Sequence, residues 1–393
     1  MPMLVNMLVG CRGKPATNKY RLNKELSNYA TRLRELICHN EFFVGKQPLQ
    51  GQFDALALEL FALQFAHNAA YRKICEARQL TPQNVSHWKQ IPAVPTSAFK
   101  ELELTSIPAE ERTAVFYSSG TTEQKPSRHF HCAESLAVYE ASLWQWFQIR
   151  SDHQSEFLFL TPDAKQAPHS SLVHMFDTVR QKLGGANVPV SRAAFLGNLG
   201  ADGSWVLDFE SILKRLELAC SSGKPVELLG TAFSFVHLVD YLAEKNRSFH
   251  LPKGSRVMET GGYKNRSRTM PKAELHALIR KFLGVKTILC EYGMSELSSQ
   301  AYDSEIENSQ LKIKNSERQF RFSPWARVQI ISPETGKEVA DGETGLIRIF
   351  DLANIFSVAA IQTEDLGVRR GDGFELIGRA QLAEPRGCSL MTA

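Results

Sequence analysis

The chain has 393 residues, of which 43% are hydrophobic and 22% are charged, and its formal net charge is +4. A chain of this length is longer than a single hydrophobic core usually accommodates, so we expect it to be divided into subdomains. The two signs of charge are interspersed without a dense basic run, so a nucleic-acid partner is disfavoured. No apolar run reaches the roughly 18 residues that a membrane span needs.

The cysteine pattern and the first residues indicate the compartment. The seven cysteines lack paired spacing, which argues against a disulfide framework or a zinc ribbon and favours a reducing compartment. Residues 1–10 are apolar, but no Lys or Arg precedes them, so a plain N-terminal segment is favoured over an export signal. We therefore expect a cytoplasmic protein.

Residues 1–112 are expected to form a helical N-terminal part. Apolar residues recur at helical spacing from Leu22 to Ile37, and residues 53–71 predict a longer apolar helix. The prolines of residues 91–95 interrupt any helix, because proline lacks an amide donor and forces its predecessor into extended geometry.

Residues 113–321 alternate short apolar strands with amphipathic helices. This alternation predicts an α/β fold with a mainly parallel sheet. The expected strands are Glu156–Leu160, Val226–Leu229, Arg256–Glu259 and Lys286–Cys290, and the expected helices are Glu210–Cys220, Ser234–Glu244 and Pro271–Leu283.

Residues 322–380 change to strands joined by tight turns. The expected strands Ala326–Ile331, Gly345–Asp351 and Phe374–Ile377 predict a small antiparallel β subdomain. Residues 381–393 are expected to form a short tail.

The sharpest motif is residues 117–128, Tyr-Ser-Ser-Gly-Thr-Thr-Glu-Gln-Lys-Pro-Ser-Arg. Small hydroxyl residues around a glycine let the backbone approach an oxyanion and add hydrogen-bond donors. Lys125 and Arg128 add positive charge suited to phosphate. The spacing of a Walker loop is absent. A phosphate-binding loop and an ordinary Ser/Thr-rich turn both account for this composition.

Two further motifs carry acidic residues. Tyr292 offers a flat face for an adenine ring, and Glu296, four residues later, can hold a hard cation. An ordinary turn with a surface glutamate is the alternative. In residues 363–367, Asp365 can accept the two hydroxyls of a ribose, although acidic turns near glycine are common on surfaces.

The order of these motifs resembles the pattern of acyl-adenylate-forming enzymes: a Ser/Thr/Gly loop, Tyr-Gly-x-x-Glu, and x-x-Asp-Leu-Gly before Gly-Arg. More narrowly, the chain resembles the acyl-protein synthetase family of bacterial luminescence fatty-acid reductase systems, over about residues 90 to 390. The segments that carry the resemblance are Val94–Lys100, Ser118–Thr122, Glu259–Gly262 and Pro385–Ser389.

The resemblance implies an ATP site with magnesium. Tyr292 would stack on the adenine, Glu296 would coordinate Mg²⁺, and Asp365 would hold the ribose hydroxyls with help from Arg379. The residues implied at the phosphates are Ser118, Ser119, Gly120, Thr121 and Thr122, and those against the adenine are Gly261 and Gly262.

Two departures from the superfamily pattern affect the expected chemistry. Lys125, a candidate catalytic residue, precedes Pro126 where the order Pro-Lys is more common. The chain ends at Ala393, whereas the superfamily usually continues for about 110 residues as a small domain. We therefore expect the chain to lack that C-terminal small domain and to have no CoA-ligase activity.

The implied function is ATP-dependent activation of a fatty acid to acyl-AMP, followed by acyl transfer to a protein cysteine for a partner reductase. The resemblance also implies Cys388 as the acceptor, because members of that family carry the acyl group on a cysteine near the C-terminus. A thiolate is the nucleophile that such a transfer needs, and the nearby Arg386 would lower its pKa. A free thiol in a frayed tail is the alternative. For the whole chain, one alternative is a stand-alone adenylating enzyme that supplies a carrier protein, and another is a non-catalytic scaffold.

Overall fold

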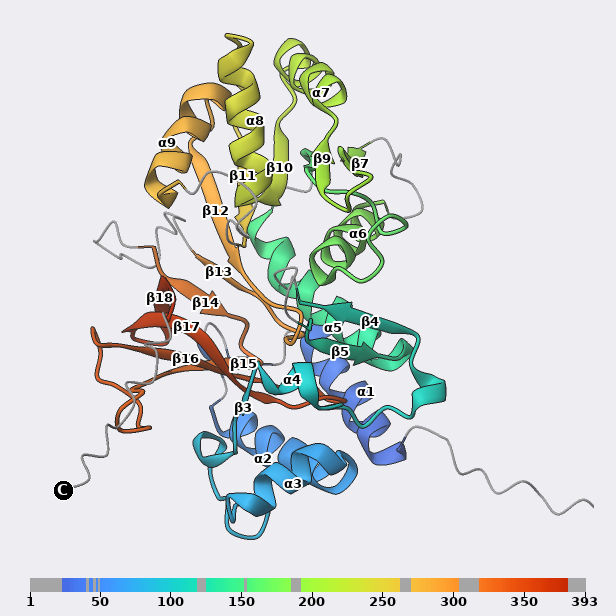
Figure 1. The fold of residues 1–393 in the computed structure, drawn as a ribbon, viewed down its shortest axis with the longest axis vertical. Helices are drawn as coiled ribbons and strands as arrows, with labels where there is room; N and C mark the ends of the chain where they lie inside the picture. The colour runs from blue at the N-terminus through green and yellow to red at the C-terminus, as the bar shows by residue number, and fades with distance from the viewer. Residues whose placement is uncertain are drawn as a thin grey trace, which may run out of the picture.

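The computed structural model describes residues 23–39, 42–44, 47–48, 50–118, 125–151, 154–184, 192–261, 270–303 and 318–380. Within these residues, twelve strands form one large mixed sheet, to which several helical layers are packed (Figure 1). The sheet is built from β3 (Val94–Pro95), β6 (Glu156–Phe159), β7 (Ala193–Phe195), β10 (Val226–Thr231), β11 (Arg256–Thr260), β12 (Thr287–Tyr292), β13 (Ala301–Asp303), β14 (Phe320–Phe322), β15 (Ala326–Ile331), β16 (Thr344–Asp351), β17 (Ala360–Arg370) and β18 (Gly373–Arg379).

Helices cover the sheet and form the end of the molecule that lies lowest in Figure 1. All the helices expected from residue 210 to residue 283 are present, with bounds that differ by a few residues. The α-helices are α1 (Lys24–Cys38), α2 (Gln50–His67), α3 (Ala69–Ala77), α4 (Ala98–Glu101), α5 (Ala133–Phe147), α6 (Ser171–Leu183), α7 (Phe209–Ser222), α8 (Ala232–Glu244) and α9 (Lys272–Leu283).

One half of the sheet is parallel, in the order β7-β6-β10-β11-β12. Alternate residues of β10 enter different cores: Leu228 packs with α7, α8 and α9, and Leu229 packs with α5 and α6. This arrangement follows from the two-residue period of a strand and gives a layer of helices on each face. The expected α/β fold is confirmed.

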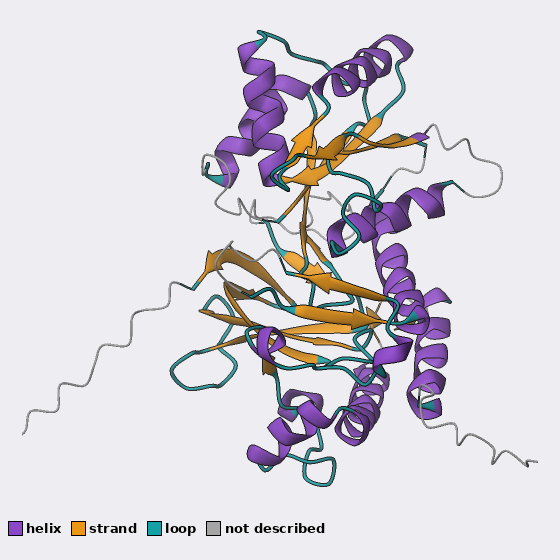
Figure 2. Ribbon diagram, turned by 45° about the vertical axis from the view of Figure 1, so that its right-hand side comes forward, coloured by secondary structure: helices purple, strands orange, loops and turns teal. Residues whose placement is uncertain are grey.

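The other half of the sheet is antiparallel, apart from β3, which pairs in parallel with β17, and it continues the parallel half without a break (Figure 2). β13 pairs antiparallel with β12, and the order then runs through β14, β18, β17 and β16 to β15. Hydrogen bonds through β13 and β14 therefore join the two halves into one sheet. The domain boundaries at residues 112, 321 and 380 stay predictions.

β17 is the longest strand of the sheet and was missing from the expected strands. Its residues 362–365 are Gln, Thr, Glu and Asp, which interrupt any apolar alternation. The strand is held by pairing with β16 on one side and β18 on the other, with a register shift at Leu366 and Gly367. Nonlocal pairing therefore overrides the weak local preference.

The N-terminal part is helical as expected, but it contains two helices, α2 and α3, where the sequence predicted one. The single helix predicted over residues 53–71 is broken at Asn68, whose side-chain oxygen accepts a hydrogen bond of 3.1 Å from the Tyr71 amide and begins α3. An asparagine at this position is a strong N-cap. No helix in the described part of the chain is long and apolar enough to span a membrane.

Candidate functional site

Two of the motifs lie where neighbouring parallel strands end. Gly261 directly follows β11, and Tyr292 is the last residue of β12, which pairs in parallel with β11. Gly261 has a φ of +68°, a conformation that glycine adopts without steric cost. The carboxyl edge of a parallel sheet is the usual place for a ligand in α/β folds. Gly262 lies outside the described residues.

Tyr292 and Asp365 meet across the join between the two halves of the sheet. The Tyr292 hydroxyl donates a hydrogen bond of 2.8 Å to Oδ2 of Asp365. The Tyr292 ring is buried, with edge contacts to three aromatic rings whose centroids lie 5.3–6.3 Å away. These rings belong to Phe320, Phe322 and Phe374. The aromatic cluster therefore fixes the orientation of the tyrosine.

Asp365 is paired in register with Arg379 across β17 and β18. The Arg379 Nε lies 3.8 Å from Oδ1 of Asp365, and the arginine side chain is 83% exposed. Such an exposed ion pair contributes little to stability, so the arginine can turn to a ligand at small cost. Burial raises the pKa of Asp365 above its usual value, with the Tyr292 hydrogen bond and the Arg379 charge acting in the opposite direction.

The base of the Ser/Thr/Gly loop is a β-hairpin formed by β4 (Ala114–Tyr117) and β5 (Arg128–His131). Ser118 and Ser127 close the hairpin: the Ser118 amide donates to the Ser127 carbonyl at 3.2 Å, and the Ser127 amide donates to Oγ of Ser118 at 3.0 Å. Ser119, Gly120, Thr121 and Thr122 lie outside the described residues.

Glu296 lies against this hairpin. The Ser127 hydroxyl donates to Oε1 of Glu296, and the Ser295 hydroxyl donates to Oε2 at 2.9 Å. The backbone around the glutamate is held as well, because Nδ2 of Asn354 donates to the Glu296 carbonyl at 2.8 Å. Glu296 is therefore a buried carboxylate in a rigid setting next to the loop expected to bind phosphates.

The donor set at Glu296 fits a hard cation. Mg²⁺ is usually held by one or two carboxylates together with phosphate oxygens and water. The Glu296 carboxylate and the Ser127 hydroxyl offer oxygen ligands of this kind.

Lys125 forms an ion pair with a glutamate of α4. Its Nζ lies 3.4 Å from Oε2 of Glu101 on α4, and both side chains are more than half exposed. Exposed pairs of this kind are weak and do not hold the lysine in place. Its expected catalytic role stays a prediction, as does that of Cys388, which lies outside the described residues.

Sequence reasoning missed three residues that support the site. Ser127 lies in the first motif, but the sequence assigned it no function. No sequence pattern pointed to Asn354 or His129. His129 is buried and its Nδ1 lies 2.7 Å from the Ser295 carbonyl, next to Glu296. Burial lowers the pKa of His129 to about 4, with the Ser295 hydrogen bond acting in the opposite direction, so the imidazole is neutral at physiological pH. Side chains that position other side chains are recognised only from their contacts.

Glu291 is a further buried carboxyl group at this edge of the sheet. Burial, and then the negative charge of Glu259, raise the pKa of Glu291 to about 8. In the unfolded chain the carboxyl group loses its proton above about pH 4.5, whereas in the folded chain it stays protonated up to about pH 8. Stability is therefore lost as the pH rises through this window.

Replacing Glu291 by glutamine is expected to remove this pH dependence. Relative to the Glu291→Gln variant, the free energy of unfolding of the wild type should fall by about 1.4 kcal/mol per pH unit between pH 5 and pH 8. Urea unfolding at pH 5, 6.5 and 8 measures the difference. Parallel stability profiles of the two proteins would show that Glu291 ionises normally.

The fold resembles that of 2-hydroxyisobutyryl-CoA ligase. One structure of this ligase, in complex with 2-HIB-AMP and CoA, matches with a TM-score of 0.59 and 13% identity, over 84% of this chain and 69% of the ligase. A second, in the postadenylation state with 2-HIB-AMP, matches with a TM-score of 0.56 and 12% identity, over 93% of this chain and 72% of the ligase. At this level of identity the similarity concerns the fold alone.

Two proteins described as long-chain-fatty-acid–luciferin-component ligases are similar in sequence. The protein from Aliivibrio fischeri is 25% identical over 363 residues, which cover 86% of this chain and 87% of the relative. The protein from Vibrio harveyi is 24% identical over 346 residues, 84% of each chain. The family model described as acyl-protein synthetase, LuxE, matches residues 40–393. The chain therefore belongs to the LuxE acyl-protein synthetase family.

Proposed function

We propose that the protein activates a carboxylic acid with ATP to form an acyl-adenylate and pyrophosphate. The observation that carries this proposal is the convergence of three distant motifs: Ser127 contacts Glu296, and Tyr292 contacts Asp365. A phosphate-binding loop, a cation ligand and a ribose acceptor are the groups that a site for ATP needs.

In the proposed reaction, a carboxylate oxygen of the acid attacks the α-phosphorus of ATP, the bond to the bridging oxygen breaks, and pyrophosphate leaves. The chain positions the reactants and stabilises charge rather than bonding covalently to them. Asp365 and Arg379 hold the ribose, and the donors at the base of the loop face the phosphates. Bound at Glu296, Mg²⁺ would neutralise phosphate charge.

We propose a long-chain fatty acid as the substrate and a protein cysteine as the acyl acceptor. The descriptions of the two relatives support this choice of acid, because both name a long-chain fatty acid. In the transfer step the Cys388 thiolate attacks the acyl carbonyl, AMP leaves, and the thiol proton passes to solvent. The thioester would then supply a reductase partner.

ATP–pyrophosphate exchange tests the proposed activation. Purified protein, Mg²⁺, ATP and labelled pyrophosphate are incubated with unbranched acids of increasing chain length and with aromatic and amino acids as controls. Exchange that depends on a long-chain acid is the expected result. Exchange with an aromatic or amino acid instead would replace the fatty acid in the proposal, and the absence of exchange with every acid would contradict adenylation.

A further inference from the structure

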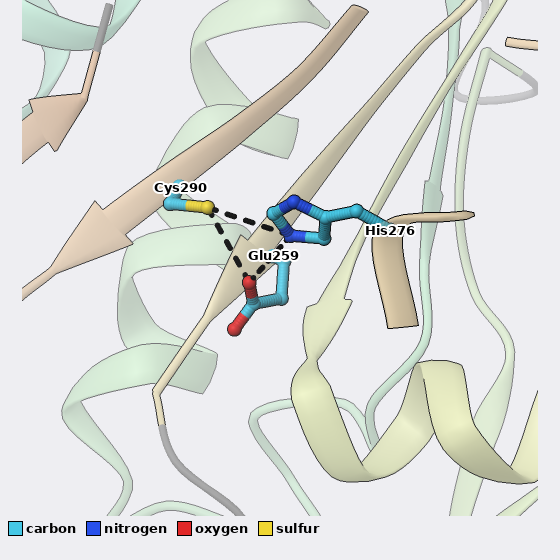
Figure 3. Close-up of side chains that lie close together, drawn as sticks. All are labelled: Glu259, His276 and Cys290. Carbon is cyan, nitrogen blue, oxygen red and sulfur yellow. Dashed lines mark hydrogen bonds and ion pairs between the residues drawn. The ribbon is translucent and has the colours of Figure 1, made fainter. Parts of the chain in front are cut away.

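A buried group of three side chains lies next to the candidate ATP site, on the strands that carry it. Glu259 comes from β11, Cys290 from β12 and His276 from α9, and they converge as Figure 3 shows. Oε2 of Glu259 lies 3.1 Å from Nε2 of His276 and 3.3 Å from Sγ of Cys290. All three residues are buried, with exposures of 6% or less.

Arg318 determines which nitrogen of His276 carries the proton. Its Nη1 lies 2.8 Å from Nδ1 of His276, and its Nε lies 2.5 Å from Oδ2 of the fully buried Asp303. A guanidinium group only donates hydrogen bonds, so Nδ1 of the imidazole must accept. The proton of the neutral imidazole is therefore on Nε2, where it is donated to Glu259.

The protonation states of the other two groups agree with this direction of donation. Burial opposes ionisation of Glu259, but the His276 hydrogen bond and the charge of Lys272 outweigh it and lower the pKa of the carboxyl group below its usual value. Burial, and then the charges of Glu259 and Asp303, raise the pKa of the Cys290 thiol well above its usual value. An ionised Glu259 thus accepts from a neutral imidazole and from a protonated thiol.

The spacing of the three side chains also suits ligands of one metal ion, since one ligand atom from each lies within 4.8 Å of the others. A histidine that binds a metal through Nε2 carries its proton on Nδ1 and donates it to an acceptor. Here Nδ1 faces Arg318, which cannot accept, and the Lys272 ammonium lies only 3.9 Å from Oε2 of Glu259. The arrangement therefore opposes a cation.

The group is connected to the wall of the candidate ATP site through β11 and β12 and through Lys272, which pairs with Glu259. Residues two apart on a strand share a face of the sheet. Cys290 is therefore on the same face of β12 as Tyr292 and precedes it by two residues. Glu259 likewise precedes Gly261 by two residues at the end of β11. The Lys272 Nζ lies 5.2 Å above the ring of Phe320, whose centroid is 6.1 Å from that of Tyr292.

We propose that Arg318, His276, Glu259 and Cys290 form a metal-free buried relay that positions Gly261 and Tyr292 for the adenine ring of ATP. The relay residues are positioning residues, because each acts through the ends of β11 and β12. This inference rests on the proposed function in one respect, which is that ATP is the nucleotide bound at Gly261 and Tyr292.

The first test compares two equally buried glutamates. Glu227 is 6% exposed, as is Glu259, but it lies at the amino end of β10. Glu259→Ala is expected to raise the KM for ATP by at least about fivefold with kcat changed by less than about twofold, and Glu259→Gln, which can still accept from His276, should restore the KM. Glu227→Ala should leave the KM unchanged. Equal effects of the two alanine variants on the KM would overturn the positioning role.

A milder pair of variants keeps the test decisive if Glu259→Ala does not fold. Cys290→Ser retains a donor to Glu259, whereas Cys290→Val has a similar volume without one. Only the valine variant should raise the KM for ATP, by about twofold or more. Equal KM values for the serine and valine variants would contradict the relay.

The second test needs no activity. Nitrogen NMR of the full chain should show Nε2 of His276 protonated and Nδ1 unprotonated, and metal analysis after incubation with Zn²⁺ should find no ion that depends on His276. In the absence of ATP, amide hydrogen exchange at residues 258–261 and 290–292 should increase in Glu259→Ala but not in Glu227→Ala. Zinc binding lost in His276→Phe, or unchanged exchange in Glu259→Ala, would overturn the inference even in a protein without adenylation activity.

Discussion

Replacing Asp365 or Glu296 by alanine is expected to lower ATP–pyrophosphate exchange at least about tenfold, a loss of about 1.4 kcal/mol of transition-state stabilisation. The Asp365→Ala variant would lack the proposed contact with the ribose, and the Glu296→Ala variant would lack the proposed ligand to Mg²⁺. Because Glu296 also accepts from Ser127 and Ser295, Glu296→Gln is the cleaner variant, since an amide retains an acceptor but lacks the charge. Initial rates of exchange, with circular dichroism to confirm folding, measure the effect.

The chain offers a matched control for Asp365. Glu364 is the preceding residue of β17, is exposed, and points to the opposite face, so Glu364→Ala should retain full exchange. Tyr292→Phe removes only the hydroxyl that donates to Asp365, and it should cost less than Asp365→Ala because the ring remains. Full exchange in folded Asp365→Ala and Glu296→Gln would show that the ATP site lies elsewhere.

Cys388→Ser is expected to abolish covalent attachment of the acyl group while leaving ATP–pyrophosphate exchange intact. Adenylation precedes transfer, so a variant without the thiol still forms acyl-AMP but cannot form the thioester. The wild type incubated with ATP, Mg²⁺ and a labelled fatty acid should carry label that hydroxylamine releases. Mass spectrometry of peptides from the labelled protein locates the acyl group.

Two other cysteines control for nonspecific acylation of thiols. Cys38 and Cys220 are exposed, so they are accessible to acyl-AMP released into solution. The variants Cys38→Ser and Cys220→Ser should retain the label. A label located on either of these cysteines, or the absence of any thioester in a protein that does exchange pyrophosphate, would exclude Cys388 as the acceptor. Direct transfer to a partner protein would then be the better account.

The sequence by itself was sufficient for the fold class, the motif order and the family resemblance. The expected strands and helices between residues 156 and 290 were recognised from short apolar runs and amphipathic spacing, which depend only on neighbouring residues. α6 and β7 lie in the same range and were not among them. The motifs around Ser118, Tyr292 and Asp365 combine residue types that adenylation chemistry requires, and these types are also visible locally. Amphipathic periodicity and residue chemistry are properties of a short stretch of chain, so a single sequence reveals them.

Only the tertiary structure decided which of these residues meet. β17 is a strand because β16 and β18 pair with it, although its sequence around Asp365 is polar. The contact of Ser127 with Glu296 joins residues 169 positions apart, and that of Arg318 with His276 joins residues 42 positions apart. Such contacts depend on the register of the sheet and on the exclusion of water, neither of which is encoded in a local pattern.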